Sequence, residues 1–128
     1  MEKTKLLVMD DDVPFTTVLK SQLERSGPYE VHVENDSTRI IETATEFMPH
    51  LILLDIVMPG LDGGDVEALL KAHPTLKHIP VLIVSALVSE HDAPGDAVVQ
   101  SGKNVIVSKP VNTEKLMAAI EQKLDGTI

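Results

Sequence analysis

The sequence predicts an α/β fold in which a parallel sheet is covered by helices on both faces. Strand and helix patterns alternate along all 128 residues. Short aliphatic runs such as Leu6–Met9 and Leu51–Leu54 are typical of strands buried on both faces. Segments with apolar residues at helical spacing separate these runs. Because crossovers between parallel strands are right-handed, a doubly wound sheet of five strands and five helices is expected.

The expected strands are short and consist mainly of Val, Ile and Leu, which favour buried sheet positions. Turn residues or helix starts follow each of them. The strands are expected over residues 5–9, 29–33, 51–55, 80–85 and 104–107.

Each expected helix is placed by capping and terminating residues. Asp12 and Asn112 have side chains suited to cap a first turn, and Gly27-Pro28 and Pro49 are helix terminators. The helices are expected between Asp12 and Gly27, between Asp36 or Ser37 and Pro49, over 65–72, over 94–101, and from Asn112 to Leu124. Their inward faces are expected to contain Phe15, Val18, Leu19 and Leu23; Ile40, Ile41, Ala44 and Phe47; Val66, Leu69 and Leu70; Leu116, Met117, Ile120 and Leu124.

Composition excludes several classes of function. The formal net charge of -9 and the pI near 4.8 argue against nucleic acid or an anionic membrane as a partner. The chain has no cysteine, so thiolate chemistry and a disulfide framework are excluded. The N-terminal residues lead directly into a strand, and no apolar run approaches membrane-spanning length. We expect one cytoplasmic domain over residues 1–128.

Acidic residues follow two of the predicted strands directly. Asp10 and Asp11 come after the first strand, and Asp55 ends the third. Ser85 ends the fourth strand, and Lys109 follows the fifth. Because ligands of open α/β sheets bind at the carboxyl ends of the strands, these side chains are expected to share one edge of the sheet.

Three carboxylates at one edge require a compensating cation. Two of them about 4 Å apart repel by roughly 4 kcal/mol at an effective dielectric constant of 20. Mg²⁺ is the expected ion, because it prefers oxygen ligands and retains waters that a phosphate can replace. No glycine-rich phosphate loop follows the first strand. The pattern therefore favours a phosphoryl group held next to Mg²⁺, with a carboxylate as its acceptor.

The chain resembles the response-regulator receiver domain, the phosphoacceptor module of two-component signalling. The matching segments, in order and spacing, are residues 7–12, 54–63, 84–86 and 108–110. The resemblance implies a flavodoxin-like sheet with the strand order 2-1-3-4-5. It also implies a signalling module rather than a conventional enzyme.

The resemblance further implies a role for each site residue. Asp11 and Asp55 would ligate Mg²⁺ directly, the backbone carbonyl of Val57 would assist, and Asp10 would act through water. Asp55 would be the phosphoacceptor. Ser85 would donate a hydrogen bond to the phosphoryl group, and Lys109 would pair with it, while Asp12 would cap a helix.

The sequence departs from the family pattern at three places. Ile106 occupies the position where an aromatic switch residue is often found. Val57 and Leu87 flank the expected path of the hydrolytic water, and neither side chain can hydrogen-bond to it. We therefore expect slow self-dephosphorylation.

The implied partners are a sensor histidine kinase or a histidine phosphotransfer protein, and an unidentified downstream protein. The domain would be a monomer or a dimer that depends on phosphorylation, and the face formed by the fourth helix, fifth strand and fifth helix would respond to it. Two alternatives remain. One is a phosphatase similar to haloacid dehalogenases, with Asp10 as nucleophile, although Pro14 departs from that pattern. The other is a pseudo-receiver that acts only as an interaction module.

Overall fold

The computed structural model describes residues 3–55, 63–85, 98–101, 104–108 and 112–126. These residues form strands and helices that alternate over most of the chain. The strands are β1 (Thr4–Met9), β2 (Tyr29–Glu34), β3 (Leu51–Leu54), β4 (Val81–Ser85), β5 (Val98–Ser101) and β6 (Asn104–Ser108). The helices are α1 (Val13–Ser26), α2 (Ile40–Phe47), α3 (Gly63–Ala72) and α4 (Thr113–Leu124), with a 3₁₀ turn, η1 (Ser37–Arg39), before α2.

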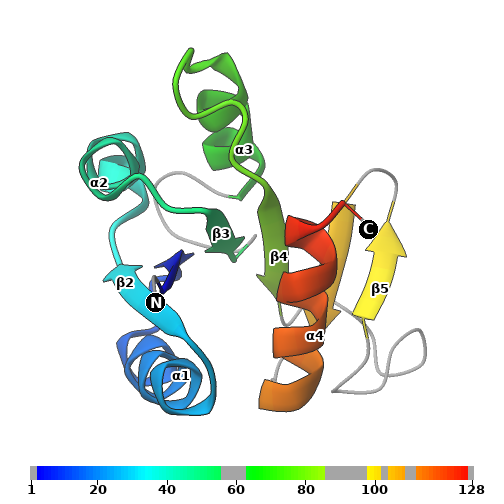
Figure 1. The fold of residues 1–128 in the computed structure, drawn as a ribbon. Helices are drawn as coiled ribbons and strands as arrows, with labels where there is room; N and C mark the ends of the chain where they lie inside the picture. The colour runs from blue at the N-terminus through cyan, green and yellow to red at the C-terminus, as the bar shows by residue number, and fades with distance from the viewer. Residues whose placement is uncertain (1–2, 56–62, 86–97, 102–103, 109–111, 127–128) are drawn as a thin grey trace.

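The strands form one sheet with the order β2-β1-β3-β4-β6-β5 (Figure 1). All neighbouring pairs from β2 to β6 are parallel. The strand predicted over 104–107 is β6, which lies beside β4. The predicted α/β class and the order of the first four strands are therefore confirmed.

The helix predicted over 94–101 is wrong for residues 98–101. These residues form β5, which pairs with β6 in an antiparallel register, with Ser101 opposite Asn104. Val98 and Val99 are β-branched and favour strands over helices. The two residues between β5 and β6 begin with glycine, a pattern typical of a tight hairpin connection. Residues 94–97 lie outside the described part of the chain.

The core consists of two apolar layers, one on each face of the sheet. Along β1, Leu6 and Val8 face one layer, and Leu7 and Met9 face the other, as the two-residue period of a strand requires. Helices α1 and α4 cover the first face, and α2 and α3 cover the second (Figure 1). All four residues of β1 named here are almost fully buried, so β1 is covered on both faces between its neighbours β2 and β3.

Two residues predicted to face the core are exposed. Val18 is 55% exposed on α1, and Leu69 is 41% exposed on α3. Each directly precedes a buried leucine, Leu19 or Leu70. Since successive helical residues are rotated by about 100°, a helix that buries a single stripe leaves such a neighbour facing outward.

The N-caps predicted for the first and last helices are confirmed. Asp12 accepts a hydrogen bond from the backbone N–H of Phe15, and Asn112 accepts one from that of Lys115, each at 3.0 Å. Asp36 caps η1 rather than α2 itself. Asp12 therefore fixes the start of α1 immediately after Asp10 and Asp11, the acidic residues that follow β1.

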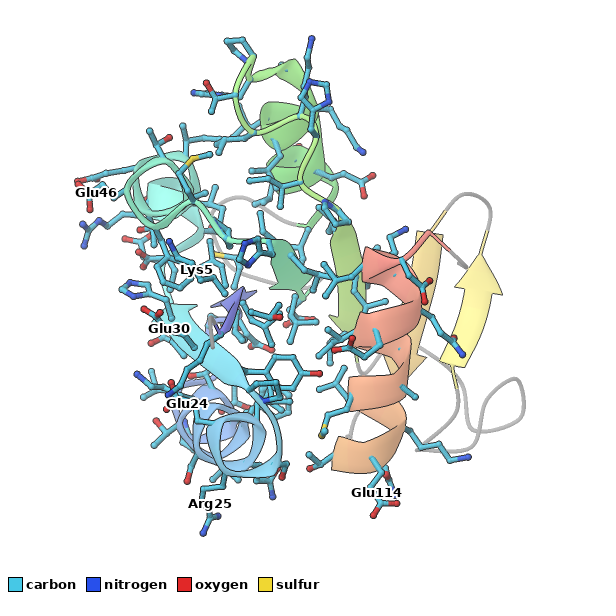
Figure 2. The ribbon with its side chains drawn as sticks, viewed as in Figure 1. Lys5, Glu24, Arg25, Glu30, Glu46 and Glu114 are labelled. Carbon is cyan, nitrogen blue, oxygen red and sulfur yellow. The ribbon has the colours of Figure 1, made fainter. Side chains whose placement is uncertain are left out.

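Two side-chain contacts hold the outer strand β2 in place. Glu24 of α1, labelled in Figure 2, accepts a hydrogen bond from the backbone N–H of Val31 at 3.0 Å, at the free edge of the sheet. The buried Tyr29 donates its hydroxyl hydrogen to Glu121 of α4 at 2.7 Å.

None of the helices among the described residues is long and apolar enough to cross a membrane.

Candidate functional site

Asp10, Asp11 and Asp55 meet at the carboxyl edge of the sheet. β1 and β3 are adjacent, with Met9 opposite Leu54, so the acids that follow the two strands emerge side by side. The backbone N–H of Asp55 donates to the carbonyl oxygen of Met9 at 3.0 Å and extends this pairing by one residue. One carboxylate oxygen from each of the three acids lies within 4.8 Å of the others. The predicted convergence of these acids is confirmed.

Two of the three acids are buried. Asp10 is 2% exposed and Asp55 is 6% exposed, whereas Asp11 is exposed. Two buried unit charges 4.8 Å apart repel by about 3.5 kcal/mol at an effective dielectric constant of 20. Like charges this close together favour the binding of positive charge at the site.

The three oxygen donors fit one small divalent cation. An octahedral Mg²⁺ shell with bonds of about 2.1 Å places neighbouring oxygens about 3 Å apart and opposite oxygens about 4.2 Å apart. The separation limit of 4.8 Å in the cluster is close to this range. The exposed Asp11 lies on the solvent side of the buried pair, where an ion that keeps some of its waters would enter.

The turn between β1 and α1 gives the consecutive aspartates different positions. The Oδ1 atom of Asp10 accepts a hydrogen bond from the backbone N–H of Asp12 at 3.0 Å. Asp12 uses its own carboxylate to cap α1, as described above. The prediction that Asp12 acts as a helix cap is therefore confirmed. Of the three consecutive aspartates, only Asp10 and Asp11 join Asp55 at the edge of the sheet.

Sequence reasoning missed Asn35, which follows β2 at the same edge of the sheet. Its side-chain amide nitrogen donates to the carbonyl oxygen of Asp10 at 2.7 Å and to Oγ1 of Thr16 at 3.0 Å. Ligands of open α/β sheets bind at the carboxyl ends of the strands, and this rule also applies to β2. Asn35 is the polar residue directly after β2, which neighbours β1, so the sequence contained a signal for it.

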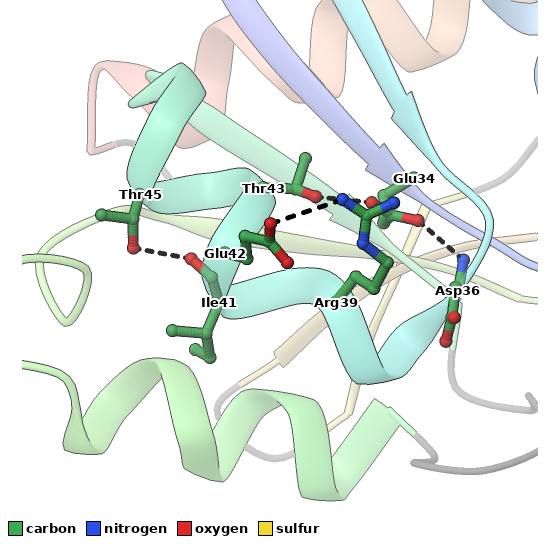
Figure 3. Close-up of polar contacts among 7 residues, drawn as sticks. All are labelled: Glu34, Asp36, Arg39, Ile41, Glu42, Thr43 and Thr45. Carbon is green, nitrogen blue, oxygen red and sulfur yellow. Dashed lines mark hydrogen bonds and ion pairs between the residues drawn. The ribbon is translucent and has the colours of Figure 1, made fainter.

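The chain that leaves β2 is held by further polar contacts, and those of Glu34 are shown in Figure 3. Glu34 accepts hydrogen bonds from the backbone N–H of Asp36 at 3.0 Å and from the hydroxyl of Thr43 at 2.5 Å. The hydroxyl of Thr38 donates to Asp36 and lowers the pKa of that carboxyl group. These contacts fix the segment on either side of Asn35.

The remaining predicted site residues are described only in part or not at all. Ser85 is the last residue of β4, and Ile83, two residues earlier, lies opposite Leu54 of β3. The backbone of Ser85 is therefore at the carboxyl edge next to the strand that leads to Asp55. Val57 and Lys109 lie outside the described residues.

Comparisons with known proteins identify the family. The model of the family described as "Response regulator receiver domain" matches residues 6–121. Response regulator PleD of Caulobacter vibrioides is 35% identical over 118 residues, which are 91% of this chain but 25% of PleD. The chain thus spans about a quarter of the length of that relative.

Other relatives match over their whole length. The polar-differentiation response regulator DivK of Brucella abortus is 30% identical over 124 residues, covering 97% of this chain and 98% of DivK. The structure of the Francisella response regulator 1452 receiver domain superposes with a TM-score of 0.76 at 27% identity, over 98% of this chain and 100% of that one. The chain belongs to the response regulator receiver domain family, the modules of two-component signalling that histidine kinases phosphorylate.

Proposed function

We propose that residues 1–128 form a single receiver domain that accepts a phosphoryl group from a phosphohistidine onto Asp55. The observation that carries this proposal is the meeting of Asp55 with Asp10 and Asp11 at one edge of the sheet. A carboxylate oxygen of Asp55 would form the new O–P bond as the N–P bond of the donor breaks. The leaving imidazole takes up a proton and becomes neutral.

In this proposal the acids hold Mg²⁺ around the phosphoacceptor. Asp11 and Asp55 ligate the ion directly, the backbone carbonyl of Val57 assists, and Asp10 acts through water. The ion supplies positive charge that offsets the carboxylates and the incoming phosphoryl oxygens. The buried positions of Asp10 and Asp55 support this assignment, because interactions between charges are stronger where water is excluded.

Ser85 and Lys109 are proposed to bind the phosphoryl group once it has been transferred. Ser85 would donate a hydrogen bond from the end of β4, and Lys109, which follows β6 in the sequence, would contribute a positive charge. Charge-assisted hydrogen bonds of this kind are about twice as strong as neutral ones. The phosphorylated state would therefore pull the ends of β4 and β6 toward the site.

The proposed output surface is formed by β5, β6 and α4. It replaces the predicted face that included a helix over 94–101, since residues 98–101 form a strand. A full swing between two states, from 1:99 to 99:1, requires about 5.5 kcal/mol of differential interaction. Ile106 of β6 lies at the position of the expected aromatic switch, so the readout of this domain would depend on aliphatic repacking.

The proposed partners are a sensor histidine kinase or a histidine phosphotransfer protein, and a downstream protein that binds the output surface. The acidic net charge of -9 disfavours direct contact with nucleic acid or an anionic membrane. A cytoplasmic location and a monomer or phosphorylation-dependent dimer remain predictions.

Labelling with acetyl phosphate tests the proposed function. The purified protein is incubated with acetyl phosphate and either Mg²⁺ or EDTA, and the covalent phosphoryl group is measured by intact mass. We expect Mg²⁺-dependent labelling of the wild type and of the control Glu46→Gln, whose acid lies on α2 and is exposed. We expect none with Asp55→Asn.

The other outcomes distinguish the alternatives. Labelling that survives Asp55→Asn and is lost in Asp10→Asn would contradict the proposal and indicate a phosphatase-like nucleophile. If the wild type is not labelled in the presence of Mg²⁺, the proposal is contradicted, and the domain would instead be a module that acts only by binding.

A further inference from the structure

Asn35 joins three parts of the fold at the edge of the acidic cluster. It follows β2, and its amide nitrogen donates both to the Asp10 carbonyl at the end of β1 and to the Thr16 hydroxyl in α1. Both partners are buried, with Asp10 2% and Thr16 1% exposed. The carbonyl of Asp10 can only accept a hydrogen bond, so the nitrogen of the amide must face it.

The bond to Asp10 fixes the peptide unit that leads to Asp11. The carbonyl held by Asn35 belongs to the peptide group between Asp10 and Asp11, and a peptide group is planar. The preceding peptide group is also held, because the N–H of Asp10 donates to the carbonyl of Glu34 at 3.2 Å. The chain leaving β2 therefore determines the direction in which the exposed Asp11 leaves the sheet.

Thr16 holds the amide of Asn35 in this position. The Thr16 hydroxyl hydrogen is directed to the carbonyl of Val13 at 3.1 Å, which leaves an oxygen lone pair for the amide of Asn35. Thr16 lies in the first turns of α1, next to the Asp12 cap. The two bonds of Asn35 thus tie the turn that contains the acids to β2 on one side and to α1 on the other.

We propose that Asn35 is a positioning residue for the Mg²⁺ site, acting on Asp11 through the Asp10–Asp11 peptide group. The inference rests on the proposed function, because it concerns the same ion. A neutral amide suits the position: it supplies two N–H donors and adds no charge beside three carboxylates. Groups that orient metal ligands in this way typically affect metal affinity by about 10- to 100-fold.

The test compares Mg²⁺ binding by the wild type and Asn35→Ala, measured by calorimetric titration with MgCl₂. We expect the dissociation constant to rise by about tenfold in the variant. In parallel, the rate of acetyl phosphate labelling is measured over a range of Mg²⁺ concentrations. Half-saturation is expected to shift by a similar factor, whereas the rate at saturating Mg²⁺ stays within about twofold, because the amide of Asn35 bonds to the Asp10 carbonyl and to Thr16 and so acts on the position of Asp11.

Two further variants separate positioning from general loss of stability. Tyr29→Phe removes a hydrogen bond to Glu121 at the opposite end of β2, and it is expected to leave Mg²⁺ binding unchanged. Thr16→Val removes the anchor of the amide and keeps the shape of the side chain. It is expected to weaken Mg²⁺ binding less than Asn35→Ala does, and the double variant should bind no more weakly than Asn35→Ala alone.

The outcomes distinguish this inference from the proposed function. A wild type that does not bind Mg²⁺ would overturn both. If the wild type binds Mg²⁺ and Asn35→Ala binds it equally well, only the role of Asn35 is overturned. The same holds if Tyr29→Phe loses as much Mg²⁺ affinity as Asn35→Ala does. A drop in the rate at saturating Mg²⁺ with unchanged half-saturation would also overturn it, since positioning of a metal ligand predicts the reverse.

Discussion

Replacing Asp55 with asparagine is expected to stabilise the protein in the absence of divalent cations. The substitution keeps the size of the side chain and removes one of the two buried charges in the cluster. Asp10 and Asp55 are 2% and 6% exposed, and their nearest ligand oxygens lie within 4.8 Å. The repulsion between them is therefore only weakly screened by water.

The expected gain follows from this geometry. Two unit charges 4.8 Å apart repel by about 3.5 kcal/mol at an effective dielectric constant of 20. Asparagine retains one oxygen acceptor, but replacing the second oxygen with an amide nitrogen disturbs hydrogen bonding by about 1 to 2 kcal/mol. The net increase in the free energy of unfolding of Asp55→Asn is therefore expected to be about 2 kcal/mol.

Urea denaturation in EDTA at low ionic strength measures this difference. With a typical slope of about 2 kcal/mol per molar urea, the midpoint should rise by about 1 M. Added Mg²⁺ should stabilise the wild type more than Asp55→Asn, because binding to the folded state alone raises stability. Glu46→Gln, which makes the same change in net charge on exposed α2, should shift the midpoint little. An Asp55→Asn protein less stable than the wild type in EDTA would show that repulsion between the two buried carboxylates does not destabilise the fold.

The remaining predictions concern the packing of β2 and the lifetime of the phosphoryl group. Burial and the hydrogen bond to Glu121 raise the pKa of Tyr29. As the pH rises, Tyr29 therefore ionises in the unfolded chain before it does so in the folded protein, which destabilises the wild type above about pH 10. At pH 7, Tyr29→Phe should be less stable than the wild type by about 1 kcal/mol. Denaturation curves of the two proteins should show that this difference becomes smaller above about pH 10. A β-carbon at Gly27 would lie 2.6 Å from the Tyr29 ring, so Gly27→Ala should lower the melting temperature, with a cost of about 1 to 3 kcal/mol; an unchanged melting temperature would contradict this contact. Because Val57 and Leu87 cannot hydrogen-bond a hydrolytic water, decay of labelled protein in Mg²⁺ buffer should be slow, and a half-life of seconds would contradict this expectation.

The alternation of strands and helices was predictable because each element must bury its own apolar residues, and this requirement leaves a pattern in each segment of the sequence. Leu6–Met9 and Leu51–Leu54 are apolar at every position, and strands covered on both faces require this. The meeting of Asp10 with Asp55 was predictable for a related reason. Once the two strands are parallel neighbours, the residues that follow them must emerge at the same edge.

Other features depend on contacts that a linear pattern does not contain. The strand β5 exists because Val98–Ser101 pairs with β6, and a short segment of this kind that ends at a glycine is compatible with either a helix or a strand. Val18 has the spacing of a core residue, yet α1 buries a narrower stripe. The role of Asn35 comes from bonds to residues 25 and 19 positions away, so only the folded chain brings them together.

Chemical mapping of the labelled residue shows whether Asp55 receives the phosphoryl group. Protein labelled with acetyl phosphate and Mg²⁺ is treated with borohydride, which reduces an aspartyl phosphate to homoserine, and its peptides are then sequenced by mass spectrometry. We expect homoserine at position 55 in the labelled protein and none in the sample kept in EDTA. Homoserine at position 10 or 11, with Asp55 unmodified, would contradict this expectation.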